Sequence, residues 1–141
     1  MRVFVAIILP DEVRDYLYAL EKEIGNEHAK IKWIEKKNLH LTLKFIGNIE
    51  DNKLNDIKER LKNISYDKFR LSLDNIGWFP GGNNFRVIWI GVRQEASVIE
   101  LQRMIDGSLL DMFSNEEKFS SHLTIGRVKL VKDKNKLADK L

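Results

Sequence analysis

Apolar residues along the chain follow two spacings, one typical of strands and one typical of helices. The continuous apolar run at residues 3–9 predicts a buried strand, and Pro10 ends it. Apolar residues then recur at helical spacing through residues 13–24, with Asp11 at the start and Gly25 just past the end. The chain therefore opens with a strand and an amphipathic helix.

The same two spacings continue along the rest of the chain. Further strands are predicted at 31–34, 39–46, 69–73 (running toward Gly77), 86–92 and 121–130, and further helices at 54–64 and 98–113. Residues 78–84 are rich in turn formers and predict a loop. The lysine-rich tail after Val128 is expected to begin a short helix. This order predicts an α+β fold of two similar halves.

Composition limits the class of protein. A length of 141 residues suits a single domain, 1–141, which two small lobes can share. The chain has no cysteine, which excludes a thiolate nucleophile and disulfides. The run at 3–9 is too short to span a bilayer and lacks a cleavage-like site, so we expect a cytoplasmic protein with no membrane partner. A net charge of +3 and a pI near 9.1 are compatible with a nucleic-acid partner.

Two tripeptides carry the candidate chemistry, His40-Leu41-Thr42 and His122-Leu123-Thr124. The chain has three histidines and only two threonines, and each threonine follows a histidine by two positions. In a strand, residues i and i+2 point to the same side, so each tripeptide offers an imidazole beside a hydroxyl. A single such tripeptide is ordinary on a polar strand face, but the repeat favours a functional site.

The pair suits proton transfer at a phosphate ester. Histidine titrates near neutral pH, so one imidazole can accept a proton from a nucleophile while the other donates one to a leaving oxygen. The threonine hydroxyls can donate hydrogen bonds to phosphate oxygens. No metal constellation accompanies them, because the histidines are far apart in the sequence and lack a carboxylate at ligand spacing. We therefore expect a reaction without a metal or other cofactor.

These motifs resemble the two-histidine (2H) phosphoesterase family, and most closely its RNA 2′,3′-cyclic phosphodiesterase branch, historically called 2′-5′ RNA ligases. The resemblance runs from residue 1 to about 130. It rests on four segments: Arg2-Val3-Phe4-Val5-Ala6 with Leu9-Pro10, His40-Leu41-Thr42-Leu43-Lys44-Phe45-Ile46-Gly47, Arg86-Val87-Ile88-Trp89-Ile90-Gly91-Val92, and His122-Leu123-Thr124-Ile125-Gly126-Arg127.

The resemblance implies a fold and a reaction. It implies a bilobal molecule with an antiparallel sheet in each lobe and the motif strands lining a central cleft. It implies hydrolysis of a 2′,3′-cyclic phosphate at an RNA end to a 2′-phosphate, with His122 as general base and His40 as general acid. Thr42 and Thr124 would hold the phosphate. Members of this branch usually continue with a further strand, so the C-terminal end here is expected to be truncated or dispensable.

Several other residues are candidate substrate contacts. Arg127 would contact the phosphate, although simple alternation places it opposite His122 unless Gly126 permits a bulge. Lys44, Arg86 and Phe79 are further candidates. Each has an ordinary structural alternative: a solvated lysine at a strand end, an ion pair, and burial. The tryptophans Trp33 and Trp89 are predicted to lie in the core, and His28 in an exposed turn.

Three functions stay open on the sequence alone. The first is hydrolysis of cyclic phosphate ends by a monomeric enzyme. The second is 2′-5′ RNA ligation at the same site, which is close to the reverse reaction. The third is a non-catalytic module that binds RNA ends, which the basic pI and the aromatic residues of 78–84 allow.

Overall fold

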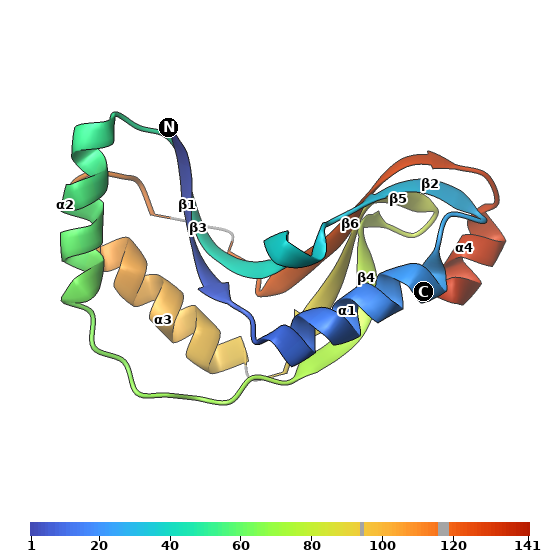
Figure 1. Cartoon of the computed structure of the whole chain (residues 1–141), viewed down its shortest axis with the longest axis horizontal. Coiled ribbons are helices and arrows are strands. Elements are labelled where there is room, and N and C mark those ends of the chain that lie inside the picture. Colours follow the sequence, from blue (N-terminus) through green and yellow to red (C-terminus); the bar gives the residue numbers. More distant parts are fainter. Residues whose placement is uncertain (94, 116–118) are drawn as a thin grey trace. The chain divides into compact units, whose positions relative to one another are not determined.

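A computed structural model describes residues 1–93, 95–115 and 119–141 of the chain (Figure 1). Its elements, in chain order, are β1 (Arg2–Ile8), α1 (Asp11–Ile24), β2 (Ala29–Trp33), the 3-10 turn η1 (Lys36–Asn38), β3 (His40–Asn48), α2 (Asp51–Lys62), β4 (Leu73–Gly81), β5 (Asn84–Val92), α3 (Glu95–Ser108), β6 (His122–Val131) and α4 (Lys134–Lys140). The predicted order of strands and helices is confirmed, including a helix in the lysine-rich tail.

The chain divides into two compact units. Unit 1 comprises Met1–Ile7, Thr42–Ser72 and Arg93–Ser121, and unit 2 comprises Ile8–Leu41, Leu73–Val92 and His122–Leu141. Strands β1 and β3 form a two-stranded sheet, and β2, β6, β5 and β4 form a four-stranded sheet in that order. The α+β class with two antiparallel sheets and flanking helices is confirmed. The single-domain assignment and the central cleft stay predictions.

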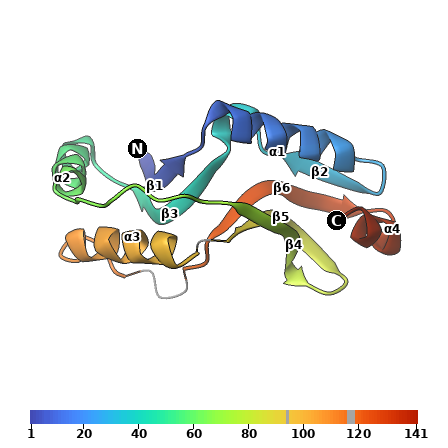
Figure 2. The same ribbon diagram turned by 90° about the horizontal axis from the view of Figure 1, so that it is seen from below.

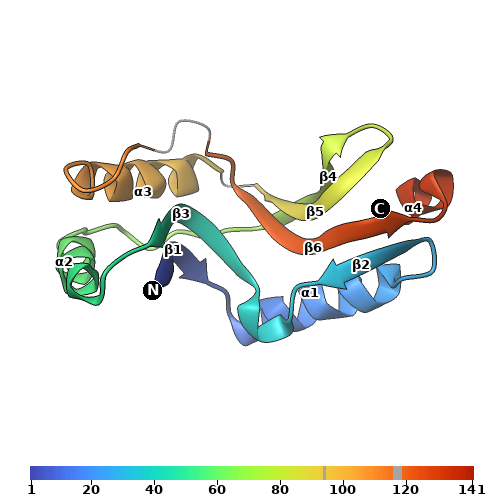
Figure 3. The ribbon, with the colours of Figure 1, turned by 90° about the horizontal axis from the view of Figure 1, so that it is seen from above.

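Unit 2 contains the whole four-stranded sheet, with β6 between β2 and β5 (Figure 3). Its core-facing residues include Ile88, Ile90, Leu123 and Ile125, all less than 4% exposed. Helix α1 runs alongside this sheet in Figures 1 and 2, and α4 is tied to it by the Lys140 ammonium, which donates to a carbonyl of α1 at 3.2 Å. The apolar core of unit 2 therefore includes the buried face of its four-stranded sheet.

Helix α1 forms because its apolar residues lie on one stripe. Leu17, Glu21 and Ile24 are buried at helical spacing, while Asp11 and Glu12 place negative charge in the first turn, where the helix dipole favours it. The helix ends at Gly25, whose φ of 62° is accessible to glycine. Glu21 is the exception in this stripe, because it is a carboxyl group only 2% exposed.

The prediction of a loop at 78–84 is wrong. Residues up to Gly81 belong to β4, which pairs with β5 from Leu73 onward, and only the tip of a β-hairpin separates the two strands. Pro80 cannot donate to a strand ladder, but β4 is the edge strand, where that loss is tolerated. The register shifts at Phe79/Pro80. The predicted strand at 69–73 begins only at Leu73, so it also lies later than expected.

Unit 1 contains most of the β1–β3 sheet together with α2 and α3, which lie side by side in Figures 1 and 2. Arg60 of α2 forms an ion pair with Asp111 just after α3, and it also donates to the Ser108 carbonyl at 3.3 Å. The Asp111 carboxylate raises the pKa of the Arg60 guanidinium through their hydrogen bond. This pair therefore links the two helices of unit 1.

The strand β3 departs from the expected alternation at Lys44. Leu41 and Leu43 are buried as predicted, but Lys44 is only 3% exposed and Phe45 is 52% exposed. The Lys44 ammonium donates to Asp106 at 2.6 Å and to the Ser114 carbonyl at 2.7 Å. The prediction of a solvated Lys44 is therefore wrong, because a partner on α3 holds this side chain inside unit 1.

No helix in the described part of the chain is long and apolar enough to cross a membrane.

Candidate active site

The boundary between the two units falls inside or beside each motif. Unit 2 begins its last segment at His122, and its first segment ends at Leu41, so both motif histidines belong to unit 2. Thr124 and Arg127 also lie in unit 2, on β6, whereas Thr42 falls in unit 1. The site described below is therefore the part that unit 2 carries.

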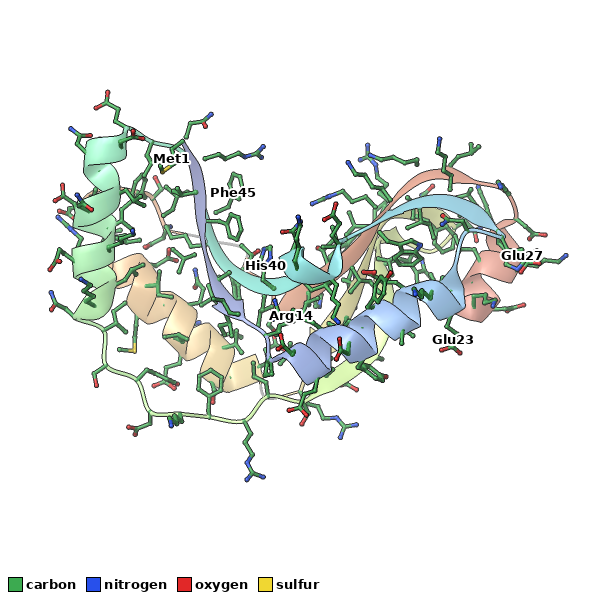
Figure 4. The ribbon with its side chains drawn as sticks, viewed as in Figure 1. Met1, Arg14, Glu23, Glu27, His40 and Phe45 are labelled. Carbon is green, nitrogen blue, oxygen red and sulfur yellow. The ribbon has the colours of Figure 1, made fainter. Side chains whose placement is uncertain are left out.

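His40 opens β3, directly after η1 (Figure 4). Its Nδ1 lies 2.5 Å from the Asn38 carbonyl oxygen. A carbonyl can only accept, so Nδ1 carries the proton of this hydrogen bond, and proton exchange with a substrate would use Nε2. The segment before His40 is also tied to β6, because the Ile34 N–H donates to the Ile125 carbonyl at 2.8 Å. Local backbone structure thus fixes the imidazole orientation.

His122 opens β6 and lies opposite Gly91 in the ladder with β5. Its ring stacks on the indole of Trp89, with centroids 3.8 Å apart and planes at 4°. The Phe79 ring lies 5.4 Å from His122 and 5.5 Å from Trp89. The candidate base is therefore part of a three-ring cluster from β4, β5 and β6.

A bulge in β6 brings Arg127 to the face that carries Thr124. In the ladder with β5, Trp89 lies opposite Thr124 and Ile88 opposite Gly126, so Ile125 is an extra residue. Val87, which shares the Trp89 face, then lies opposite Arg127. The predicted bulge at Gly126 is thus confirmed. His122, Thr124 and Arg127 all belong to one face of β6, called the site face below.

Gly126 is required at this bulge by packing. A Cβ there would lie 2.7 Å from Cε3 of Trp33 and 2.9 Å from Cγ2 of Ile31. Trp33 is opposite Gly126 in the β2–β6 ladder, and its indole occupies the space that a side chain at Gly126 would fill. The same residue therefore allows close packing on the buried side and the change of alternation that directs Arg127 to the other side.

The remaining candidates occupy different surroundings. Phe79 is 42% exposed and beside His122, a position compatible with a substrate contact. Arg86 is exposed, at the register shift between β4 and β5. Lys44 does not have a free ammonium, since Asp106 and Ser114 take it inside unit 1. The substrate role suggested for Lys44 therefore has no support in this geometry.

The predicted positions of Trp89 and His28 need correction. Trp89 is half-buried and belongs to the His122 cluster rather than to the core. His28 has a side chain only 16% exposed, beside Glu27 at 3.7 Å, so it is not an exposed turn residue. Local sequence around Trp89 reads as a continuous buried strand, and only the ladder with β6 reveals that its ring faces His122.

Metal-ligand clusters are absent from residues 1–93, 95–115 and 119–141: no three of their His, Asp and Glu side chains are grouped to hold an ion. A hollow of about 610 Å³ in unit 1 is lined by α3 and its surroundings, including Gln102 and Asp106, and contains no motif residue. The residues that line this hollow all belong to unit 1, whereas the two motif histidines belong to unit 2.

Comparison with known proteins identifies the class. A family model for LigT-like phosphoesterases matches residues 7–89. The RNA 2′,3′-cyclic phosphodiesterase of Archaeoglobus fulgidus is 36% identical over 130 residues, covering 92% of this chain and 73% of that protein. The protein of that name from Methanocaldococcus jannaschii is 36% identical over 142 residues, covering 100% and 79%.

Solved structures agree with the sequence matches. The structures of E. coli LigT with phosphate and with 3′-AMP each match with a TM-score of 0.74 and 29% identity, covering 89% of this chain and 70% of that chain. The chain belongs to the LigT-like phosphoesterase family. The resemblance inferred from the two His-Leu-Thr motifs is confirmed.

Proposed function

We propose that this phosphoesterase hydrolyses the 2′,3′-cyclic phosphate at RNA ends to a 2′-phosphate, without a metal ion. The observation that carries the proposal is that His122, Thr124 and Arg127 share the site face of β6, with His40 in the same unit. Relatives that are 36% identical carry the name of this activity, and the 3′-AMP complex of E. coli LigT supports a nucleotide-shaped substrate.

The proposed reaction is an in-line displacement at phosphorus. His122 takes a proton from water as the water oxygen bonds to phosphorus. The bond from phosphorus to the 3′ oxygen breaks, and His40 donates a proton from Nε2 to that oxygen. The products are a 2′-phosphate and a 3′-hydroxyl. Each proton-transfer role is worth about 10²- to 10⁴-fold in rate.

The phosphate oxygens need donors while charge develops on them. Thr124 and Arg127 supply a hydroxyl and a guanidinium from the site face, and a guanidinium can bind two oxygens at once. Thr42 joins them in this proposal on its sequence pattern alone. Proton transfer by two imidazoles and charge stabilisation by these donors account for the reaction without a Lewis acid.

The experiment compares His40→Ala and His122→Ala with His28→Gln as the matched control. His28 is the third histidine and lies outside both motifs; its backbone carbonyl accepts from Lys132 and Asp133, and glutamine keeps that carbonyl and a polar side chain beside Glu27. We expect each motif variant to lose about 10²-fold or more in kcat on a cyclic-phosphate oligonucleotide, and the control to keep its rate. Full activity in either motif variant would sink the proposal.

The same assay separates the open alternatives. EDTA should leave the wild-type rate unchanged, and a loss on chelation would indicate a metal. Binding of the oligonucleotide without product at any pH would indicate a non-catalytic module. Joining of two RNA ends in preference to hydrolysis would indicate ligation as the main reaction.

A further inference from the structure

The stack of Trp89 on His122 is the closest ring contact described in the molecule. The centroids are 3.8 Å apart and the planes differ by only 4°, whereas Phe79 approaches both rings at a tilt of about 40°. Parallel contact over the whole imidazole leaves its edge, which carries both nitrogens, directed away from the indole. A histidine that exchanges protons needs that edge, and not its face, to meet the substrate.

The backbone of β4 sets the position of the indole. Gly77 lies opposite Trp89 in the β4–β5 ladder, and a Cβ on Gly77 would be 2.2 Å from Cζ2 and 2.4 Å from Cη2 of the indole. The ring therefore occupies the space that the side chain of any other residue at position 77 would fill. Gly91, opposite His122, has the indole 3.6 Å from its own Cβ position. A Cβ at Gly91 would make only an ordinary contact with the indole, so the missing side chain of Gly77 alone creates the shallow seat for the ring.

Packing, rather than hydrogen bonding, holds Trp89 in that seat. Its indole N–H is buried and has no acceptor among the residues the structure describes. A ring fixed for a structural hydrogen bond would have a partner there. The consequence of this packing is that the indole presents a flat face to the His122 imidazole.

We propose that Trp89, seated on Gly77, is a positioning residue that holds the His122 imidazole in the orientation required for proton transfer. This rests on the proposed function of His122 as general base. The role is distinct from substrate binding, because the indole face that would otherwise stack on a base is occupied by His122. Loss of the stack lets the imidazole rotate, and misplacement of a reacting group lowers the rate of the chemical step more than substrate affinity.

The test combines kinetics with the NMR signals of the histidine rings. The chain has three histidines, so His28→Gln and His40→Gln spectra assign the His122 signals. The NMR signals of an imidazole stacked 3.8 Å from an indole are shifted upfield by the ring current of the indole. We expect Trp89→Leu to remove this shift and lower kcat about tenfold, the size of an aromatic pair contribution, with KM unchanged. Trp89→Phe keeps a flat ring and should restore most of kcat.

Two further variants keep the result decisive if Trp89→Leu folds poorly. Gly77→Ala displaces the indole without removing any aromatic side chain, and it should reproduce the loss of the shift and of kcat. Trp78→Phe is the matched control, since Trp78 stacks on Phe85 rather than on His122 and its loss should change neither quantity.

The outcomes separate this proposal from the one on which it rests. A wild-type protein without hydrolysis would overturn the proposed function, and the upfield His122 signal would still report whether the stack exists. An active wild-type enzyme in which Trp89→Leu or Gly77→Ala keeps kcat would overturn the positioning role alone. A fall in kcat that Trp89→Phe does not restore, with KM raised in proportion, would assign Trp89 to substrate binding instead.

Discussion

Gly126 joins the buried side of the sheet to the site face through a single residue. Its missing side chain leaves room for Trp33, and the extra residue beside it reverses the alternation so that Arg127 lies on the Thr124 face. Neither effect needs an unusual φ, since Gly126 is not among the glycines with positive φ. Close packing by the Trp33 and Ile31 side chains is therefore the physical reason for glycine at this position.

Replacing Gly126 should affect stability and activity together. The Cβ of Gly126→Ala overlaps Trp33 and Ile31, and overpacking of this kind costs about 1–3 kcal/mol. The strand must shift to relieve it, so kcat/KM should fall as well. Arg127→Ala should lower kcat/KM without the loss of stability. Urea unfolding and the cyclic-phosphate assay measure the two effects.

A matched control exists in unit 1, where Gly107 has no atom within 4 Å of its Cβ position. Gly107→Ala should keep kcat/KM and should not lower stability, because alanine is favoured over glycine within helix α3 by up to about 1 kcal/mol. A Gly126→Ala protein as stable and active as wild type would show that the close packing over Gly126 is not maintained in solution.

Individual residues also show what sequence alone can give. Strand periodicity predicted Leu41 and Leu123 in the core, and both are 1% exposed. It also suggested a bulge at Gly126, which the β5–β6 ladder contains. It failed at Lys44 because the partner, Asp106, lies 62 residues away. It failed at Trp89 because the neighbour that matters is on β6. Local patterns carry no information on partners distant in sequence.

Among the elements, β4 shows why strand order matters more than local propensity. Pro80 and two following glycines are typical of a loop, yet β4 continues to Gly81 because it lies at the edge of the sheet. Edge position is a property of the whole sheet and is invisible in a short window. The strands and helices with regular apolar spacing, such as α1 and β6, were predictable because their burial depends on one repeating face.

Helix α1 contains a carboxyl group that makes stability depend on pH. Burial raises the pKa of Glu21 from 4.5 to about 7. Between these values the folded chain keeps a proton that the unfolded chain releases, so stability falls as pH rises from about 4.5 to about 7. The full difference amounts to about 3 kcal/mol. Glu21→Gln should therefore match wild type near pH 4.5 and exceed it in stability above pH 7.

Urea unfolding at both pH values measures this difference. Glu23→Gln, an exposed position on the same helix, is the control and should follow the wild-type pH dependence. Parallel pH dependence in wild type and Glu21→Gln would mean that Glu21 is ionised with little cost in the folded chain.

The ion pair between β3 and α3 predicts a second effect on stability. Lys44→Met removes the partner of a buried carboxylate, and breaking a buried pair on one side costs about 3–5 kcal/mol. Adding Asp106→Asn removes the uncompensated charge and should recover part of that loss. Thermal or urea unfolding measures it, with the exposed Lys58→Met on α2 as control. Equal stability of Lys44→Met and wild type would contradict the buried pair.

At the scale of the whole molecule, the position of the positive charges says more than the net charge of +3. Lys32 is exposed and lies opposite Arg127 in the β2–β6 ladder, so both belong to the site face of unit 2. Paired residues of neighbouring strands point to the same side of a sheet. Arg127 and Lys32 thus form a short cationic row that continues sideways from the strand that carries His122 and Thr124. Under the proposed function, a longer RNA would bring further phosphates to this row.

This row predicts a salt dependence that changes with substrate length. Each phosphate of a single strand neutralised by a cation contributes about −0.7 to the slope of log affinity against log salt. We expect kcat/KM to fall more steeply with salt for a cyclic-phosphate oligonucleotide than for a 2′,3′-cyclic mononucleotide, which has no neighbouring phosphates. Lys32→Gln should reduce the oligonucleotide slope by about 0.7 and leave the mononucleotide slope unchanged.

Lys58→Gln, exposed on α2 of unit 1, should change neither slope. Equal slopes for the two substrates would mean that only the terminal phosphate is bound, and an equal effect of Lys58→Gln would mean that net charge alone, rather than the row on the site face, attracts the RNA.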